Sequence, residues 1–309
     1  MSNPGVSVVI PAHNYAHYLP TAIGSVLAQT WDALEVLVID DGSTDGTPEV
    51  FAQFTDPRVR CVRQENAGLS AARNTGIREA RHDFIAFLDA DDAWQPDFIE
   101  IAMRQLTALD GRFSLIAAAT LRMDSGGRPL DAPKFSFERN GELTVQDFCL
   151  RNRPLSSSIV VSRAVFEKCG CFDTTLRSSE DRDMWIRATA AGFRFWFLDQ
   201  PLALIRRHGG NMSKNARRMK QNSRAVLLKA WRSGAVSRWT PFWLRAFSVH
   251  FFQIAWTHFD GGYRVRAFAY LAGSVLLWPV HLRPKRFFEP HLFRARAFAN
   301  FLRRSLAGS

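Results

Sequence analysis

Strand-like and helix-like segments alternate through the first hundred residues, and this alternation restricts the fold more than any other feature of the sequence. Four short runs have the composition of buried β-strands: Val6–Ile10, Leu34–Ile39, Val59–Arg63 and Phe84–Leu88. Helical spacing or a helix start signal follows each of them: Leu19–Leu27, a short helix from Thr47, Leu69–Ala80 and Pro96–Leu109. Strands that alternate with helices predict an α/β fold of Rossmann-like type, with a mostly parallel central sheet and helices on both faces.

Polar residues follow each of these four strands. They are Pro11, Ala12, His13 and Asn14, then Asp40 and Asp41, then Asn66 and Gly68, then Asp89, Ala90 and Asp91. Ligands of open parallel sheets bind outside the carboxyl ends of the strands. Because those ends lie on one edge, we expect these residues to form a single site.

Asp89 and Asp91 are the candidate metal ligands. Two carboxylates two residues apart, directly after a buried strand, offer the hard oxygen ligands that suit Mg²⁺ or Mn²⁺ together with substrate phosphate oxygens. The alternative is that Asp91 or Asp92 caps the helix that begins near Pro96. The position at the sheet edge favours the metal.

Asp41 and Arg73 are candidate nucleotide contacts. A carboxylate after the second strand can accept hydrogen bonds from a ribose hydroxyl or a base N–H, although Asp-Gly-Ser is also a common turn sequence. Arg73, in the helix after Gly68, can meet a diphosphate. The alternative for Arg73 is an ordinary solvated surface arginine.

Two later segments carry further candidates. Glu180 and Asp181 precede a helix, where one of them can serve as general base for an acceptor hydroxyl, or both can simply favour the helix N-terminus. His208 lies in a glycine-rich loop with Arg206 and Arg207, where it can bind a metal or a phosphate. An isolated loop histidine more often does neither.

Together these segments resemble family 2 glycosyltransferases of the GT-A fold. The matching motifs, in the order of the family, are VSVVIPAHN (6–14), VIDDGSTDGT (38–47), NAGLSAARNTG (66–76), FLDADD (87–92), EDRDMWIR (180–187) and RRHGGNMS (206–213). Each motif is modest alone, but six in register form a specific signal that covers residues 5–215.

The resemblance implies an inverting transfer of sugar from a nucleotide diphosphate sugar, usually a UDP-sugar, to an acceptor hydroxyl. The residues implied around the nucleotide are Pro11, Ala12, Asn14, Asp40, Asp41, Asn66, Arg73, Asp89 and Ala90. Asp91, Asp89 and His208 would bind Mn²⁺ or Mg²⁺, and Asp181 would be the catalytic base, supported by Glu180.

Two departures from the common family pattern leave roles open. The first motif has Pro-Ala-His-Asn where Pro-x-Tyr-Asn is commoner, so the role of His13 is not assigned. Ser178 and Ser179 stand where small glycines often precede Glu-Asp, which leaves the shape of the acceptor loop undetermined.

The later part of the chain differs in character. Leu115–Thr120 and Ile159–Val161 predict short strands and Asp181–Ala190 a helix, whereas residues beyond 215 predict only helices, broken near Gly261-Gly262, Pro279 and Pro284. We therefore expect a catalytic domain over residues 1–215 and a basic, aromatic helical region over residues 216–309.

Charge separates the two parts as well. Residues 1–200 contain 20 basic and 27 acidic residues, a net charge of −7, whereas residues 201–309 contain 20 and 2, a net charge of +18. The apolar stretch 267–282 is shorter than the ~20 residues of a membrane span. A helical region lying on an anionic membrane surface fits this composition, the alternatives being a solvated helical subdomain or a dimer contact. No nucleic-acid-binding module is recognisable.

Two other functions fit the sequence less well. A sugar nucleotidyltransferase needs a Gly-rich, basic loop after its first strand, and Pro11–Tyr18 contains no Gly, Lys or Arg. A catalytically silent membrane-associated binding module would not need the acidic motif positions, which are all present. The N-terminus predicts no secretory signal and the four cysteines form no disulfide framework. We therefore expect a cytoplasmic protein, peripheral on the inner face of the cell membrane. No residue pattern specifies the donor sugar, the acceptor or the oligomeric state.

Overall fold

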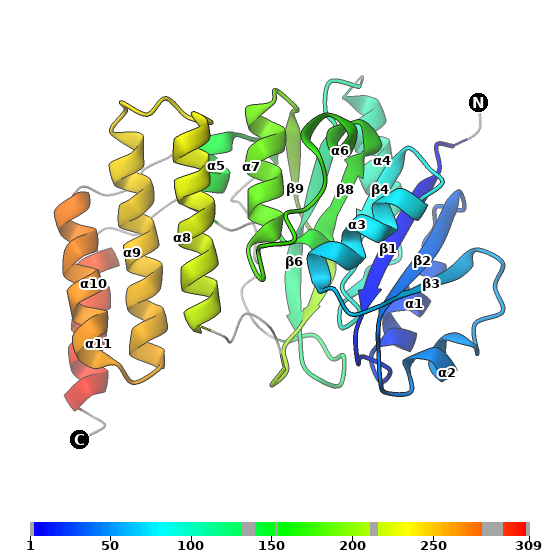
Figure 1. The fold of residues 1–309 in the computed structure, drawn as a ribbon, viewed down its shortest axis with the longest axis horizontal. Coiled ribbons are helices and arrows are strands. Elements are labelled where there is room, and N and C mark those ends of the chain that lie inside the picture. The colour runs from blue at the N-terminus through cyan, green and yellow to red at the C-terminus, as the bar shows by residue number, and fades with distance from the viewer. Residues whose placement is uncertain are drawn as a thin grey trace.

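A nine-stranded sheet forms the centre of the molecule, with helices on both faces and further helices at one end (Figure 1). The computed structural model describes residues 3–109, 111–130, 140–151, 154–210, 216–279 and 293–306. The strands are β1 Val6–Ala12, β2 Leu34–Asp41, β3 Val59–Gln64, β4 Phe84–Phe87, β5 Ala93–Trp94, β6 Leu115–Met123, β7 Gly141–Leu143, β8 Ile159–Ser162 and β9 Phe195–Arg206. The predicted α/β class is confirmed.

Helices connect these strands and then continue beyond them. Those within the first 200 residues are α1 Leu19–Leu27, α2 Thr47–Phe51, α3 Leu69–Glu79, α4 Phe98–Ala108, α5 Val145–Leu150, α6 Arg163–Cys169 and α7 Glu180–Ala190, with a 3₁₀ turn η1 at Ser156–Ser158. The C-terminal helices are α8 Ala216–Ser233, α9 Phe242–Asp260, α10 Arg264–Leu277 and α11 Phe293–Leu306.

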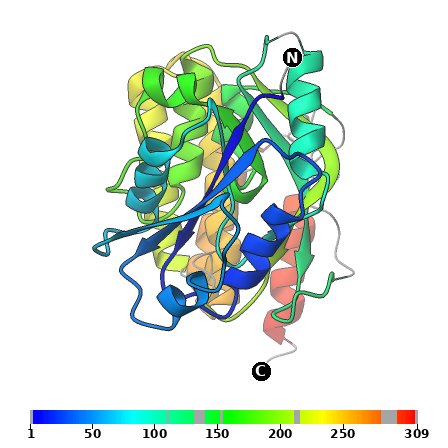
Figure 2. The same ribbon diagram turned by 90° about the vertical axis from the view of Figure 1, so that its right-hand side faces the viewer.

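Strand direction brings most carboxyl ends to one edge. The main path of the sheet is β3-β2-β1-β4-β8-β6-β9-β5, and β7 pairs with β9. The first four strands of this path are parallel, and β8 pairs antiparallel with both β4 and β6. Consequently β6 runs in the same direction as β4, and its neighbour β9 is parallel to it. In Figure 2 the first strands lie in front of the C-terminal helices, because these parts occupy opposite ends of the long axis.

The core divides between the two faces of the sheet. Along β1, Val9 packs into the cluster under α3, whereas Val8 and Ile10 pack into the cluster under α1 and α4. Every residue of β1 and β2 is buried. Strands covered on both faces are apolar throughout rather than alternating, which is why these two were evident in the sequence.

Helix α3 approaches β1 unusually closely. A Cβ atom on Gly76 would lie 2.2 Å from Cγ1 of Val9, a separation that real side chains do not adopt. Only glycine therefore allows this packing distance. It brings the start of α3, with Arg73, down onto the carboxyl edge of the sheet.

Strand β9 was not predicted from the sequence, and neither were β7, α5 or α6. Pro201 lies within β9, and proline cannot donate to a sheet ladder, so it weakens a strand prediction. The structure accommodates it by an irregularity: Ala118 pairs with Leu198, but the next residue, Ala119, pairs with Pro201. Asp199 and Gln200 are thus extra residues on the β9 side, as in a β-bulge.

Two of the C-terminal helices end where the sequence predicted breaks, whereas the end of α8 at Ser233 was not predicted. Helix α9 ends at Asp260, directly before Gly261 and Gly262, and α10 ends at Leu277, two residues before Pro279. The predicted break at Pro284 lies outside the described residues. None of the helices that the structure describes is both long enough and apolar enough to cross a bilayer.

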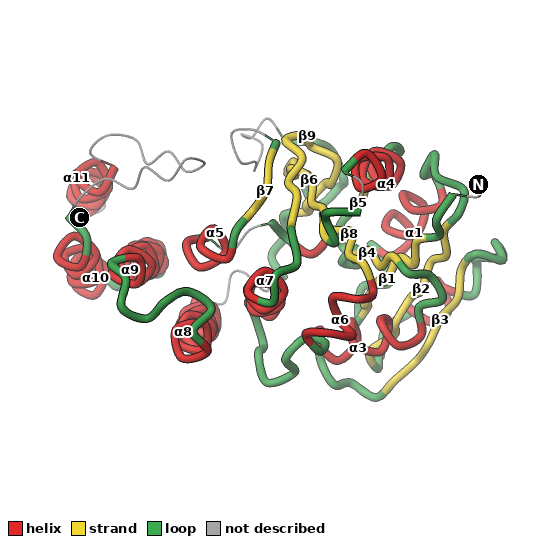
Figure 3. Tube along the Cα trace, turned by 90° about the horizontal axis from the view of Figure 1, so that it is seen from above, coloured by secondary structure: helices red, strands yellow, loops and turns green. Residues whose placement is uncertain are grey.

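Packing continues across the expected domain boundary at residue 215. Val226 and Leu227 of α8 and Trp243 of α9 belong to the same buried cluster as the strand residues Val9 and Phe87. The remaining helices, α10 and α11, form a separate small cluster with the second half of α9. Viewed from above, α8 and α9 lie between the sheet domain and α10–α11 (Figure 3). The division at residue 215 stays a prediction, and no gap in the core marks it.

Candidate active site

A cavity of about 650 Å³ opens at the carboxyl ends of β1, β2 and β4. Ten of the residues predicted from the sequence line it: Pro11, Ala12, Asp41, Asn66, Arg73, Asp89, Ala90, Asp91, Glu180 and Asp181. Asn14, Asp40 and His208 are not among its lining residues. Segments separated by up to 170 positions in the chain thus share one cavity, as the strand topology predicted.

Asp41, at the end of β2, holds the loop that precedes α3. Its Oδ1 accepts hydrogen bonds from the Ala67 N–H (2.9 Å) and Gln64 Nε2 (2.7 Å), and its Oδ2 accepts one from the Gly68 N–H (2.8 Å). Gly68 has φ +91°, in the region that favours glycine. The carboxylate therefore fixes the backbone of this loop, and it still lines the cavity.

His13, whose role the sequence left open, joins the same group. Its Nδ1 lies 2.8 Å from the backbone oxygen of Asp41, so this nitrogen carries the proton and donates. The Asn66 side chain also donates to that oxygen, at 3.1 Å. His13 thus links the ends of β1 and β2 at the cavity wall.

Asn14 and Asp40 shape turns beside the cavity. Asn14, with φ +60°, accepts hydrogen bonds from the Thr44 N–H (2.8 Å) through its side-chain oxygen. Asp40 is buried and accepts one from the Ser43 N–H (2.9 Å). For Asp40 the geometry matches the turn chemistry that was the alternative interpretation of this motif.

Arg73 connects the two acidic motifs. Its side chain is 2% exposed, which excludes the solvated surface arginine. Nη2 donates to Asp89 Oδ1 at 2.7 Å, and Nη1 donates to Glu180 Oε1 at 2.6 Å. Burial acts to lower the pKa of Arg73, but Asp89 and Glu180 raise it well above its usual value. The guanidinium therefore stays charged and ties α7 to the end of β4.

Asp91 and Asp92 occupy the turn after β4 and cap no helix. Helix α4 begins at Phe98, with Asp97 at its N-cap position. Asp92 accepts hydrogen bonds from Ser157 Oγ (2.7 Å) and from the Arg206 N–H (2.9 Å), so it joins η1 and β9 to this turn. Burial, together with the nearby charges of Asp91 and Asp89, raises the pKa of Asp92 well above its usual value.

His208 is held against Asp91. Its Nε2 lies 2.8 Å from Asp91 Oδ2, and its Nδ1 accepts a hydrogen bond from the Gly210 N–H at 3.2 Å. Because Nδ1 is an acceptor, Nε2 carries the proton that is donated to Asp91. The ring also packs against Tyr18, with centroids 5.1 Å apart. These contacts fix His208 against the turn that carries Asp91, although His208 does not line the cavity.

The donor set suits a divalent cation of the Mg²⁺ or Mn²⁺ kind. Burial and the charge of Asp89 raise the pKa of Asp91, so two carboxylates here repel each other in a partly dehydrated space. Within the described part of the chain, no group of three or more His, Cys, Asp or Glu side chains is arranged to hold an ion. Such ions commonly bind one or two carboxylates and take the remaining ligands from substrate phosphates. The residues present fit that pattern.

Asp181 is a buried carboxylate whose surroundings raise its pKa. It is 8% exposed, and its Oδ1 accepts a hydrogen bond from the Arg182 N–H at 2.7 Å. Burial raises the pKa of Asp181 to about 7, helped by Glu180 and opposed by Arg73. A carboxylate with this pKa can take up a proton near neutral pH.

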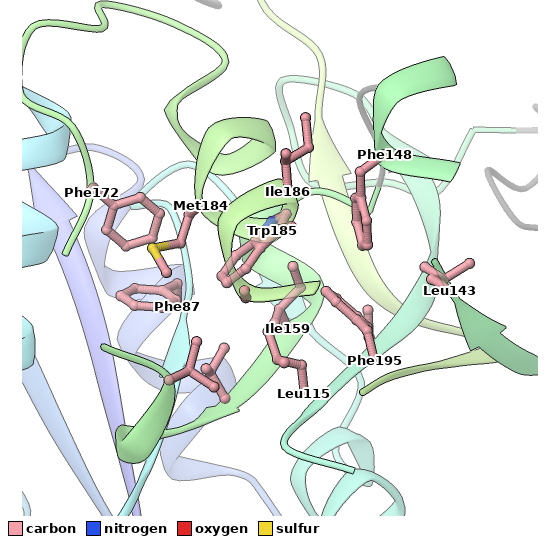
Figure 4. Packing of buried hydrophobic residues seen from close by; sticks show 14 of the residues in the cluster. Phe87, Leu115, Leu143, Phe148, Ile159, Phe172, Met184, Trp185, Ile186 and Phe195 are labelled. Carbon is pink, nitrogen blue, oxygen red and sulfur yellow. The ribbon is translucent and has the colours of Figure 1, made fainter. Parts of the chain in front are cut away.

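Helix α7 is anchored so that its first turn faces the cavity. Trp185 lies in the core, with its ring 6.0 Å from both Phe172 and Phe195 (Figure 4). Ser179, directly before the helix, has φ +61°, a conformation that only a minority of non-glycine residues adopt. Glu180 and Asp181 are positioned at the cavity because Trp185 is packed in the core and the turn at Ser179 fixes the start of the helix.

Several residues of the site were not found from the sequence. They are Tyr15, Leu155, Ser156, Ser157 and Met219, which line the cavity, and Asn222, which lies behind it. With its amide oriented to match its neighbours, Asn222 of α8 accepts hydrogen bonds from the N–H groups of Arg177 (3.0 Å) and Ser178 (2.9 Å). No local motif marks these residues, because each acts through a contact with a distant segment.

Comparison with known proteins places this site in context. The family model "Glycosyl transferase family 2" matches residues 7–142. The putative glycosyltransferase EpsH of Bacillus subtilis is 36% identical over 134 residues, which are 43% of this chain and 38% of EpsH. The putative teichuronic acid biosynthesis glycosyltransferase TuaG of B. subtilis is 30% identical over 217 residues, 69% of this chain and 82% of TuaG. The chain thus spans well under two thirds of EpsH but most of TuaG.

Solved structures share the fold. TarS (residues 1–349) of S. aureus, in complex with UDP-GlcNAc, superimposes with a TM-score of 0.61 and 16% identity, over 90% of this chain and 93% of that one. The mannosyltransferase PcManGT of Pyrobaculum calidifontis, in complex with GDP-Man and Mn²⁺, gives a TM-score of 0.65 and 19% identity, over 99% and 81%. At sequence identities this low, the structural similarity establishes the fold alone.

Proposed function

The chain belongs to glycosyl transferase family 2 and is a glycosyltransferase, and on this basis we propose that its cavity transfers a sugar from a UDP-sugar to an acceptor hydroxyl with inversion. One observation carries the proposal. Asp41, Asp91 and Asp181, from three distant segments, line the same cavity at the carboxyl edge of the sheet. A donor and an acceptor held there would meet beside a buried carboxylate, and such positioning supplies much of the acceleration in transfer reactions.

The nucleotide would lie along the ends of β1 and β2. Pro11, Ala12, Asp41 and Asn66 form this wall of the cavity. Asn14 and Asp40 would act from behind it by fixing the turns. Two solved structures of the same fold hold nucleotide diphosphate sugars, UDP-GlcNAc in TarS and GDP-Man in PcManGT. The choice of uridine for this chain rests on the family resemblance.

Asp91 and Asp89 would hold Mn²⁺ or Mg²⁺ beside the diphosphate, with His208 fixing Asp91. When bound, such an ion offsets the negative charge that develops on the departing diphosphate. Arg73 is committed to Asp89 and Glu180 by short ion pairs. The role of Arg73 would therefore be to orient these two carboxylates rather than to bind phosphate by itself. Ala90, which lines the cavity next to Asp89, would lie against the nucleotide.

Asp181 would act as the general base. Its carboxylate takes the proton of the acceptor hydroxyl as the oxygen attacks the anomeric carbon from the face opposite the diphosphate. Glu180 would keep Arg73 and the first turn of α7 in place through its 2.6 Å contact. The raised pKa of Asp181 matches a base that works near neutral pH.

The acceptor would be a growing surface polysaccharide or a lipid-linked glycan. One relative, TuaG, is named for teichuronic acid biosynthesis. The strongly basic C-terminal region would bring the enzyme to the inner face of the cell membrane, where such acceptors are presented.

The decisive experiment is a transfer assay of the full chain with a panel of nucleotide sugars, in Mn²⁺, in Mg²⁺ and in chelator. Hydrolysis or transfer that depends on the ion and prefers one UDP-sugar is the expected result. Asp181→Asn should lower the transfer rate by about 10²–10⁴-fold while nucleotide affinity, measured by calorimetry, stays near that of the wild type. Asp173→Asn, outside the cavity, is the matched control. Transfer at the wild-type rate by Asp181→Asn would disprove the assignment of the base.

A further inference from the structure

Helix α10 presents an apolar face to the outside of the molecule. Ala267, Leu271 and Ser274 are its buried residues, packed toward α9 and α11. On the opposite side, the exposed positions 265, 269, 272 and 276 carry Val, Ala, Ala and Leu. Their spacing of four, three and four residues places them in one line along a helix. Val265 and Leu276, at the two ends of this line, are each 84% exposed.

Helix α11 adds two exposed apolar side chains next to α10. Phe298 packs against Phe268 of α10, with ring centroids 5.3 Å apart, yet Phe298 and Leu302, one turn further on, are still 49% and 44% exposed. We define the outer face as Val265, Ala269, Ala272 and Leu276 of α10 together with Phe298 and Leu302 of α11. Helices α10 and α11 lie at the end of the molecule farthest from β1–β3 (Figures 1 and 3).

Both helices of the outer face also carry exposed arginines. The exposed arginines nearby are Arg264 and Arg266 at the start of α10 and Arg296, Arg303 and Arg304 on α11. The sequence from residue 201 to the end contains only two acidic residues against 20 basic ones. A second copy of this chain would bring the same arginines against each other, which opposes a homodimer through this face. An anionic lipid surface is complementary both to the apolar side chains and to the arginines.

We propose that the outer face of α10 and α11 is a membrane-docking surface, whose apolar side chains enter the interface of an anionic bilayer while the flanking arginines contact lipid phosphates. This inference deepens the proposed membrane association and rests on it. It assigns contact with lipid to six named side chains on two helices, and none of the six lines the catalytic cavity.

The test is co-sedimentation of the full chain with vesicles of phosphatidylcholine alone and of phosphatidylcholine mixed with phosphatidylglycerol. Wild-type protein should bind the anionic vesicles and not the neutral ones. The double variant Val265→Glu/Leu276→Glu should bind the anionic vesicles at least about tenfold more weakly. Each substitution removes the favourable free energy of moving an apolar side chain out of water, and it adds a negative charge that anionic lipid repels. Both positions are exposed, so the fold should be unaffected. Leu130→Glu, an exposed leucine in the first half of the chain, is the matched control.

Unchanged vesicle binding by the double variant would overturn the proposal, and so would equal binding of the wild type to neutral vesicles. A wild-type dimer that the double variant converts to a monomer, without vesicle binding by either, would instead assign the face to a second copy and also overturn it. Hydrolysis of the nucleotide sugar in solution should be the same for wild type and double variant. If the wild type hydrolyses no nucleotide sugar at all, that result would count against the enzymatic proposal alone, because vesicle binding is measured separately.

Discussion

Asp181 is the residue whose environment most directly predicts behaviour. Burial raises the pKa of Asp181 from 3.8 to about 7 with help from the charge of Glu180, whereas Arg73 and the hydrogen bond from the Arg182 N–H oppose this rise. The ionised form is therefore costly in the folded protein, and the same form is the one that a general base requires. Activity and stability should respond to pH in opposite directions through this one group.

We expect kcat to fall as the pH drops below about 7 and to level off above it, because protonated Asp181 cannot accept a proton. For stability the sign is reversed. The folded state prefers protonated Asp181, so this stabilisation is fully present below pH ~4 and is lost as the pH rises to about 7. Asp181→Asn should consequently raise the free energy of unfolding at pH 8 by as much as about 4 kcal/mol. A flat rate profile between pH 5.5 and 8 would contradict the assignment.

The acidic residues of the site could be predicted from the sequence, and several other members could not. Asp41, Asp89 and Asp91 follow strands directly, so the topology of a parallel sheet alone puts them on one edge. Ser157 reaches Asp92 across 65 positions of the chain, and no periodicity or turn signal encodes that contact. Arg73 was predicted as a phosphate ligand, but its commitment to two carboxylates depends on where α7 packs.

Helices and strands differ in how far local sequence determined them. The first four strands are short runs between helices, three of them apolar throughout most of their length, and each was predicted within a few residues. Strand β9 contains Pro201 and was missed, because its irregular pairing with β6 is a property of two strands together. The ends of α9 and α10 were predicted correctly, since glycine and proline act locally.

The close packing of α3 on β1 gives a prediction for an element. Gly76→Ala should destabilise the protein by about 1–3 kcal/mol, because the new methyl group would overlap the Val9 side chain and push α3 off the sheet. Gly24→Ala in α1 is the matched control, since its Cβ would meet nothing within 4 Å. That variant should stabilise the protein by about 0.4–1 kcal/mol. Chemical denaturation measures both, and equal effects of the two substitutions would refute the close-approach argument.

Asn222 gives a second prediction at this scale, because α8 holds the loop before α7. Asn222→Ala should lower kcat by about tenfold and leave the KM for the donor unchanged, since the Arg177 and Ser178 N–H groups lose their acceptor and the first turn of α7 loosens. Asn222→Asp keeps an acceptor oxygen and should retain most of kcat. Gln221→Ala, at the exposed neighbouring position, is the control. A lower melting temperature with an unchanged kcat would show that Asn222 is merely structural.

Considered as a whole, the molecule has a catalytic core that depends on helices from its basic C-terminal region. Val226, Leu227 and Trp243 share one buried cluster with the sheet, although they follow the boundary that composition suggested. Charge and composition mark where a surface changes character. They do not mark where a hydrophobic core ends, and this is why the boundary at residue 215 could be drawn from the sequence while the shared packing could not.

We therefore expect a chain truncated after residue 215 to lose cooperative thermal unfolding and to aggregate, because removal of α8 and α9 exposes the core around Trp185. A chain truncated after Asp260 keeps both helices and should still bind nucleotide, with a lower melting temperature because the α9–α11 cluster is lost. Circular dichroism melting and calorimetry with UDP distinguish the two. A stable, nucleotide-binding 1–215 fragment would show that the core is complete without the later helices.

The separation of charge along the long axis has a consequence of its own. With a net −7 over residues 1–200 and +18 over residues 201–309, and with the sheet and α10–α11 at opposite ends, the molecule is a large permanent dipole. Any negatively charged surface exerts a torque on such a dipole within about one Debye length, ~8 Å at physiological ionic strength. The protein would thus arrive already turned, with its arginine-rich helices α10 and α11 leading.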